Sequence, residues 1–102
     1  MHLVQLLLPV VDTAGTQIPA EVFAAIRREL TERFGGVTAY TRAPAKGLWK
    51  KDAIRVEADE VMLVEVVVDR LDRDWWRGYR SALERRFAQD TLHVRALAIE
   101  QL

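Results

Sequence analysis

Hydrophobic and polar residues alternate in three stretches of the chain, which is the pattern of β-strands with one buried face. These stretches are residues 3–11, 37–42 and 92–99. A fourth stretch, EVMLVEVVVD at 60–69, is an almost unbroken apolar run rich in Val, which is typical of a central strand covered on both sides. We therefore expect four strands.

Two other stretches carry apolar residues at helical spacing. In residues 19–34, Pro19 fits a first helical position, and Gly35 can supply the left-handed residue that ends a helix. In residues 72–89, Asp72 is a good N-cap. The apolar faces consist of Val22, Phe23, Ile26, Leu30 and Phe34 in the first helix, and of Trp76, Tyr79, Leu83 and Phe87 in the second.

The resulting order is strand, helix, strand, strand, helix, strand. Two right-handed βαβ units of this kind interlock most simply as a ferredoxin-like βαββαβ sandwich, an α+β fold in which two helices cover one face of a four-stranded antiparallel sheet. We predict the spatial strand order 4-1-3-2. The chain has 102 residues, half of them hydrophobic, so residues 1–102 are expected to form a single domain with one core.

Composition and charge narrow the classes of function. Lys plus Arg equal Asp plus Glu at 15 each, so no overall field favours nucleic acid. The absence of cysteine excludes disulfides, thiolate nucleophiles and sulfur-ligated metals. The apolar start MHLVQLLLPVV lacks a basic region and reaches Pro9 and Asp12 too soon for a membrane span. We expect a cytoplasmic protein with no cofactor and no membrane or nucleic-acid partner.

With both helices on one side, the outward residues of every strand must share the opposite face of the sheet. The polar members of this uncovered face are Gln5, Thr38, Tyr40, Arg42, Glu65, His93 and Arg95, and the apolar ones are Leu3, Leu7, Val61, Leu63, Val67, Leu97 and Ile99. Large exposed apolar patches usually mark an interface or a ligand site. We therefore predict a homodimer formed through this face, with a small-molecule ligand as a further partner.

Glu65 is the charged exception in its apolar row. A carboxylate in such a row must find a partner or take up a proton. Its candidate partners are Arg42, Tyr40, Gln5 and Arg95. One interpretation is a cross-strand ion pair between Glu65 and Arg42 inside a dimer interface. The other places Glu65 in a binding or acid/base constellation with Tyr40, Arg42 and His93.

Few residues point to a specific reaction. His93 is a candidate general base, as histidines often are, but with two histidines and no cysteine we expect no metal site. Ser81 is the only serine and lies in the middle of a predicted helix, without a nucleophile elbow. No catalytic residue is assigned. The candidate ligand-binding residues are Gln5, Tyr40, Arg42, Trp49, Glu65, His93 and Arg95.

The stretch GGVTAYTRAPAKGLWKK at 35–51 contains the second strand and a basic loop. It is not a phosphate-binding P-loop, because the G-x-x-x-x-G-K-[ST] spacing is absent and no helix follows. The loop is either a solvated connection or a lid whose Trp49 closes over a pocket and whose lysines attract an anionic ligand. Residues 44–53 are expected to be the most mobile internal segment.

Four short features resemble an uncharacterised bacterial domain family of unknown function. They are RFGGVT at 33–38, Trp49, Glu60 and RRFAQ at 85–89. The resemblance covers residues 30–95 and implies a similar α+β sandwich, but it supplies no activity and no catalytic residue. It stresses Glu60, whereas the strand pattern favours Glu65.

Two hypotheses about function follow. The first is a homodimeric α+β module that is non-catalytic or binds a small, anionic ligand at the open sheet face. The alternative is a small cofactor-free enzyme of the dimeric α+β barrel type, an oxygenase or isomerase, that uses Glu65, Tyr40 and His93. An enclosed pocket containing these three residues would favour the enzyme, and a dry, filled sheet interface would favour the module.

Overall fold

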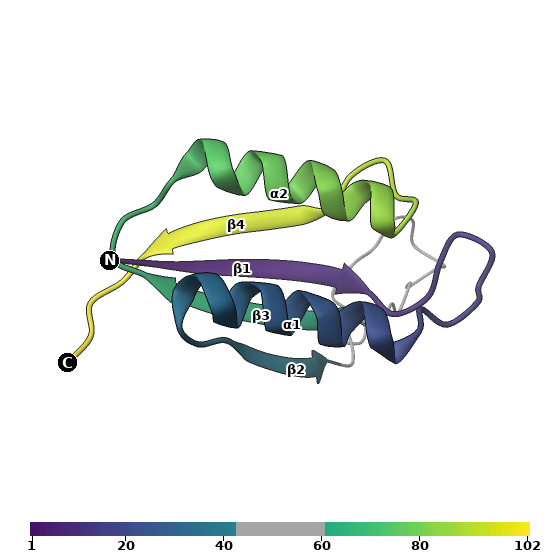
Figure 1. Ribbon diagram of the computed structural model, residues 1–102, viewed down its shortest axis with the longest axis horizontal. Coiled ribbons are helices and arrows are strands. Elements are labelled where there is room, and N and C mark those ends of the chain that lie inside the picture. Colours follow the sequence, from purple (N-terminus) through teal and green to yellow (C-terminus); the bar gives the residue numbers. More distant parts are fainter. Residues whose placement is uncertain (43–60) are drawn as a thin grey trace, which may run out of the picture.

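A computed structural model describes residues 1–42 and 61–102, with the backbone alone described at 40–42. The predicted order of elements is confirmed (Figure 1). The elements are β1 (His2–Pro9), α1 (Ala20–Phe34), β2 (Thr38–Arg42), β3 (Val61–Val68), α2 (Arg73–Arg86) and β4 (His93–Ala98). The antiparallel sheet has the order β2-β3-β1-β4, which is the predicted order 4-1-3-2 counted from the other edge.

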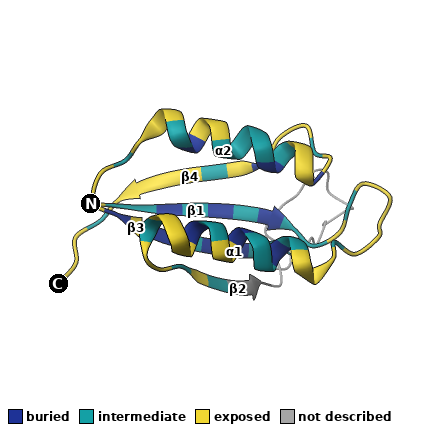
Figure 2. Cartoon of the chain, in the orientation of Figure 1, coloured by how far each residue is buried: buried dark blue, intermediate teal, exposed yellow. Residues whose placement is uncertain are grey.

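Both helices cover the same face of the sheet, as predicted (Figure 1). One buried cluster joins alternate residues of β1 and β3 to the inner faces of both helices. Its members are Val4, Leu6, Leu8, Phe23, Ile26, Leu30, Val64, Val66, Val68, Trp76, Leu83, Phe87 and Leu92. Figure 2 shows the burial in β1 and β3 and the exposure along most of β4. The central strands therefore carry the core, and β4 forms a thinly covered edge.

The ends of the helices follow from local backbone chemistry. Gly35 ends α1 with φ 84° and donates its N–H to the Thr31 carbonyl at 2.8 Å, as a left-handed C-cap does. Pro19 directly precedes α1 instead of occupying its first position. Asp72 caps α2 by accepting a hydrogen bond from the Trp75 N–H. The helix ends before the predicted residue 89 because Ala88 adopts the left-handed conformation, with φ 51°.

An aromatic cluster holds the C-terminal end of α1 against the first turns of α2. Phe34 stacks on Trp76 with 5.1 Å between ring centroids and meets Trp75 edge-on at 5.2 Å. Trp75 also stacks on Tyr79, and the Arg33 guanidinium lies 4.4 Å from the centroid of the Trp75 ring. Trp75 therefore packs between the two helices of its own chain.

A second contact between the helices is polar. Glu29 on α1 accepts hydrogen bonds from the Tyr79 hydroxyl at 2.8 Å and from Arg86 Nη1 at 2.9 Å. Burial alone would raise the pKa of Glu29, but the hydrogen bonds from Arg86 and Tyr79 outweigh it and lower the pKa below 4.5. Burial and the Glu29 carboxylate raise the pKa of the Tyr79 phenol, so this hydroxyl stays protonated and remains a donor.

Glu29→Gln is expected to lower the free energy of unfolding by about 1 kcal/mol at neutral pH, because the lost charge weakens two hydrogen bonds that are partly screened by solvent. The folded-state pKa of Glu29 is depressed, so its stabilisation is present above pH 4.5 and is lost as the pH falls through the folded-state pKa. The difference between wild type and Glu29→Gln should therefore shrink in acid. Urea unfolding at several pH values measures it, with Glu32→Gln, exposed on the same helix, as the control. A constant difference would contradict the prediction.

Candidate functional site

Register places four polar residues in one row across the sheet face opposite the helices. Gln5 on β1 lies between Glu65 on β3 and Arg95 on β4, and Glu65 lies opposite Thr38 on β2. Directly paired residues of antiparallel strands point to the same face. Because the neighbouring Val4 and Leu6 are buried under the helices, this row faces away from the core. We call it the polar row.

Hydrogen bonds connect the polar row from one side of β1 to the other. Gln5 Nε2 donates to Glu65 Oε2 at 2.7 Å, and Arg95 Nε donates to Gln5 Oε1 at 2.8 Å. The Gln5 amide thus connects a carboxylate to a guanidinium through its two ends. Gln5 and Arg95 are both predicted candidate partners of Glu65. In the structure Gln5 contacts Glu65 directly, whereas Arg95 is connected to Glu65 through Gln5. The side chain of Arg42, the other predicted cation, lies outside the described residues.

Apolar residues lie on both sides of the polar row. Leu3 pairs with Val67 and Leu97, and the side chains of Val67 and Leu97 are 49% and 46% exposed. We call these three residues the apolar row. On the other side of the polar row, Leu63 pairs with Leu7. Leu63 is buried and Leu7 is half-buried, so this face is most exposed toward the apolar row.

The residues predicted for acid/base chemistry are spread along the sheet. His93 is exposed and pairs with Leu7, one row away from Arg95. It is separated from Glu65 by the whole width of β1, so their backbones are about 12 Å apart. No hydrogen bond joins the two side chains.

Several predictions fall on positions that the structure does not describe. The backbone of Tyr40 pairs with Leu63, but its side chain is not described. Trp49, Glu60 and the basic loop lie outside the described residues. Within residues 1–42 and 61–102, no group of three His, Asp or Glu side chains is arranged to hold a metal ion.

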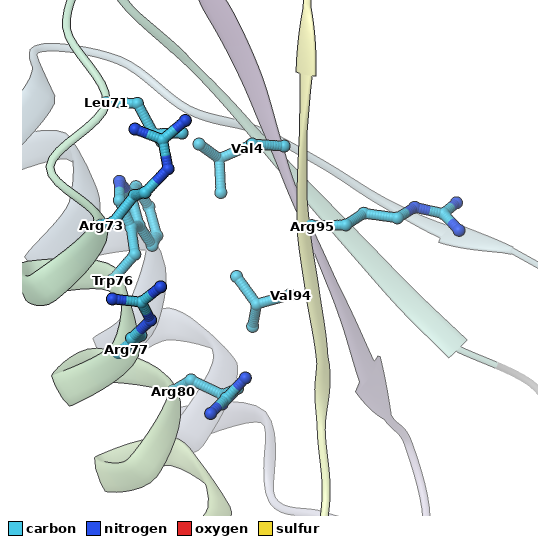
Figure 3. A pocket seen from close by; sticks show the side chains of 9 residues that line it. Val4, Leu71, Arg73, Trp76, Arg77, Arg80, Val94 and Arg95 are labelled. Carbon is cyan, nitrogen blue, oxygen red and sulfur yellow. The ribbon is translucent and has the colours of Figure 1, made fainter.

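A groove that was not predicted from the sequence lies on the other side of the sheet, between α2 and β4 (Figure 3). Its volume is about 220 Å³. The groove is lined by Val4, Leu71, Arg73, Trp76, Arg77, Arg80, Val94, Arg95 and Ala96. The sequence signal was present, since arginines at 73, 77 and 80 share one face of a helix, but that spacing is also typical of a solvated face.

No protein-family model and no curated protein matches this chain. The family resemblance noted in the sequence therefore stays a prediction. None of the helices in the described part of the chain has the length and apolar character needed to span a membrane.

Proposed function

We propose that the protein is a homodimeric module whose two sheets pack against each other through the uncovered face. The observation that carries this proposal is the charge distribution in the polar row. Glu65 and Arg95 lie on opposite sides of Gln5, each one strand away from β1. Neighbouring strands are about 4.8 Å apart, so the positive and negative charges of the row are equally distant from β1.

This arrangement selects one orientation of the twofold axis. In a dimer of facing sheets the axis lies in the plane between them. An axis parallel to β1 exchanges its two sides and sets Arg95 of each copy over Glu65 of the other. An axis parallel to the polar row would bring Arg95 over Arg95 and Glu65 over Glu65. Like charges in contact cost several kcal/mol at an interface, so we propose the axis parallel to β1.

The apolar row supplies the hydrophobic part of the proposed interface. Around an axis parallel to β1, Leu3 of one copy faces Leu3 of the other, while Val67 of each faces Leu97. The side chains of Val67 and Leu97 are about half exposed in the single chain, so pairing them removes apolar surface from water. Charge complementarity and apolar burial thus support the same arrangement.

A small ligand held between the two sheets would meet the polar row first. Arg95 offers an anionic group a guanidinium on an exposed side chain, and Gln5 and Glu65 would orient polar groups beside it. The alternative of a small enzyme requires Glu65 and His93 to act on one molecule. Their distance means that a substrate would have to bridge them, and we keep the non-catalytic module as the proposal.

Light scattering coupled to gel filtration tests the proposed dimer. We expect a mass of twice 11.7 kDa at micromolar concentration, decreasing toward one chain on dilution. A constant mass of 11.7 kDa over the whole micromolar range would contradict the proposal.

A further inference from the structure

The groove between α2 and β4 combines a basic wall with an apolar floor. Three arginines of α2 line its helical side, and Figure 3 shows their guanidinium groups beside the gap, with Val4 and Val94 directed into it. The Arg95 side chain points away from the groove, toward the polar row. Arg95 is followed by Ala96, which lines the groove. Because the side chain of Ala96 is small, it leaves the gap open and is itself exposed.

Among the described residues, the positive charge in the groove is only weakly neutralised. Arg73 forms no ion pair among the described residues. In the described part of the chain, Arg77 forms an ion pair only with Asp74, at 3.4 Å, and the Asp74 side chain is 97% exposed. Such exposed pairs contribute little to stability, so Arg77 can change partner at little cost.

Arg80 has the strongest unmet requirement of the three arginines. Its Nε is buried and donates no hydrogen bond within the described residues. The closest carboxylate, Glu84, lies 3.8 Å away and already accepts a hydrogen bond from the Leu92 N–H at 3.0 Å. Arg80 therefore has no strong partner among the described residues, and its side chain, which is 43% exposed, can offer the outer nitrogens of its guanidinium to an acceptor in the groove.

The same groove borders β4, the edge strand of the sheet. Among the described residues β4 pairs only with β1. The Ile99 N–H donates to the Met1 carbonyl at 3.1 Å. In an antiparallel pair every second residue forms such bonds, so Leu97, Arg95 and His93 also direct their backbone groups toward β1. The residues between them, Val94, Ala96 and Ala98, direct their backbone N–H and C=O groups away from β1. Such a row of unpaired groups is a template for an added strand.

We propose that this groove binds an extended acidic peptide segment of a partner protein, which adds a strand to β4 and places alternate carboxylates against the arginines of α2. Alternate residues of a strand are about 6.7 Å apart. Along the helix axis, Arg73 and Arg77 are separated by about 6.0 Å, and Arg77 and Arg80 by about 4.5 Å. Acidic residues at every second position therefore lie on one face beside the arginines, whose long side chains span the remaining difference in spacing, whereas of three consecutive acidic residues at least one points to the other face of the sheet.

Binding of two synthetic peptides tests this proposal, with isothermal titration calorimetry as the readout. The alternating peptide acetyl-TEVEVET-amide should bind at least about tenfold more tightly than acetyl-TEEEVVT-amide, which has the same composition but consecutive glutamates. Replacing two arginines, Arg73→Gln with Arg77→Gln, should weaken binding by about tenfold. Arg27→Gln, on an exposed position of α1, should leave binding unchanged. Equal affinity for the two peptides, or no effect of the double substitution, would overturn the proposal.

A backbone substitution separates strand addition from simple charge attraction. Ala96→Pro removes one outward N–H without breaking a bond to β1, a position at which an edge strand tolerates proline. It should abolish peptide binding while the circular dichroism spectrum stays that of the wild type. Independently, the wild-type amides of Ala96 and Ala98 should gain protection from hydrogen exchange when the peptide binds. Unaltered exchange at these amides, or full binding by a folded Ala96→Pro variant, would refute strand addition.

Discussion

Leu6→Ala is expected to lower the free energy of unfolding of the protein by about 3 kcal/mol. Leu6 lies on the central strand β1, is 0% exposed and packs in the cluster that joins the sheet to both helices. Removing most of its side chain loses the transfer free energy of the buried atoms and leaves a cavity that a strand between two neighbours cannot close.

Leu7→Ala provides the matched control, because the same substitution is made one residue further along the same strand. Leu7 faces the uncovered side of the sheet and is half-buried, so the expected loss is below about 1.5 kcal/mol. Unfolding in urea, followed by tryptophan fluorescence at low protein concentration, measures both variants with little contribution from association. A loss at Leu7 as large as at Leu6 would mean that the two faces of β1 are assigned incorrectly.

The second large effect concerns exchange of the charges in the polar row. Glu65→Arg or Arg95→Glu alone should weaken the proposed dimer by about tenfold to a hundredfold, because each sets like charges against each other between the two copies. The variant that carries both substitutions should recover association. Gln5 can serve the exchanged pair as well, since rotating its amide by half a turn swaps its donor and acceptor ends.

Sedimentation velocity at a series of concentrations measures this recovery. Arg27→Glu makes the same charge change as Arg95→Glu on an exposed position of α1 and should leave association unchanged. A double variant that associates no better than the single ones would contradict the facing of Glu65 and Arg95.

The face to which each strand residue belongs could be predicted from the sequence, whereas its neighbours on that face could not. Alternation placed Gln5, Glu65 and Arg95 on the side away from Leu6 and the other core residues. Alternation does not fix register, however, so it left four candidate partners for Glu65. The contact with Gln5 depends on the pairing of β1 with β3, which is set by the packing of the whole sheet.

Two local features of the structure also could not be predicted from the sequence. The spacing of apolar residues extended α2 as far as residue 89, but the left-handed backbone of Ala88 ends the helix earlier, at Arg86. Unlike glycine, alanine disfavours the left-handed conformation, so Ala88 is not recognisable in the sequence as a residue that ends a helix. The groove likewise depends on the distance between α2 and β4, which no periodicity in either element specifies.

Chemical cross-linking of introduced cysteines tests the proposed dimer most directly, because the chain has no cysteine of its own. Around an axis parallel to β1, Leu3 faces its own copy across sheets about 10 Å apart, a distance that a short bismaleimide spans. Thr38, on the edge strand β2, lies far from its copy in the same arrangement. We expect Leu3→Cys to give a covalent dimer at micromolar concentration and Thr38→Cys to remain a single chain. A covalent dimer of Thr38→Cys without one of Leu3→Cys would contradict the proposed axis, and the absence of both would contradict the sheet-to-sheet dimer.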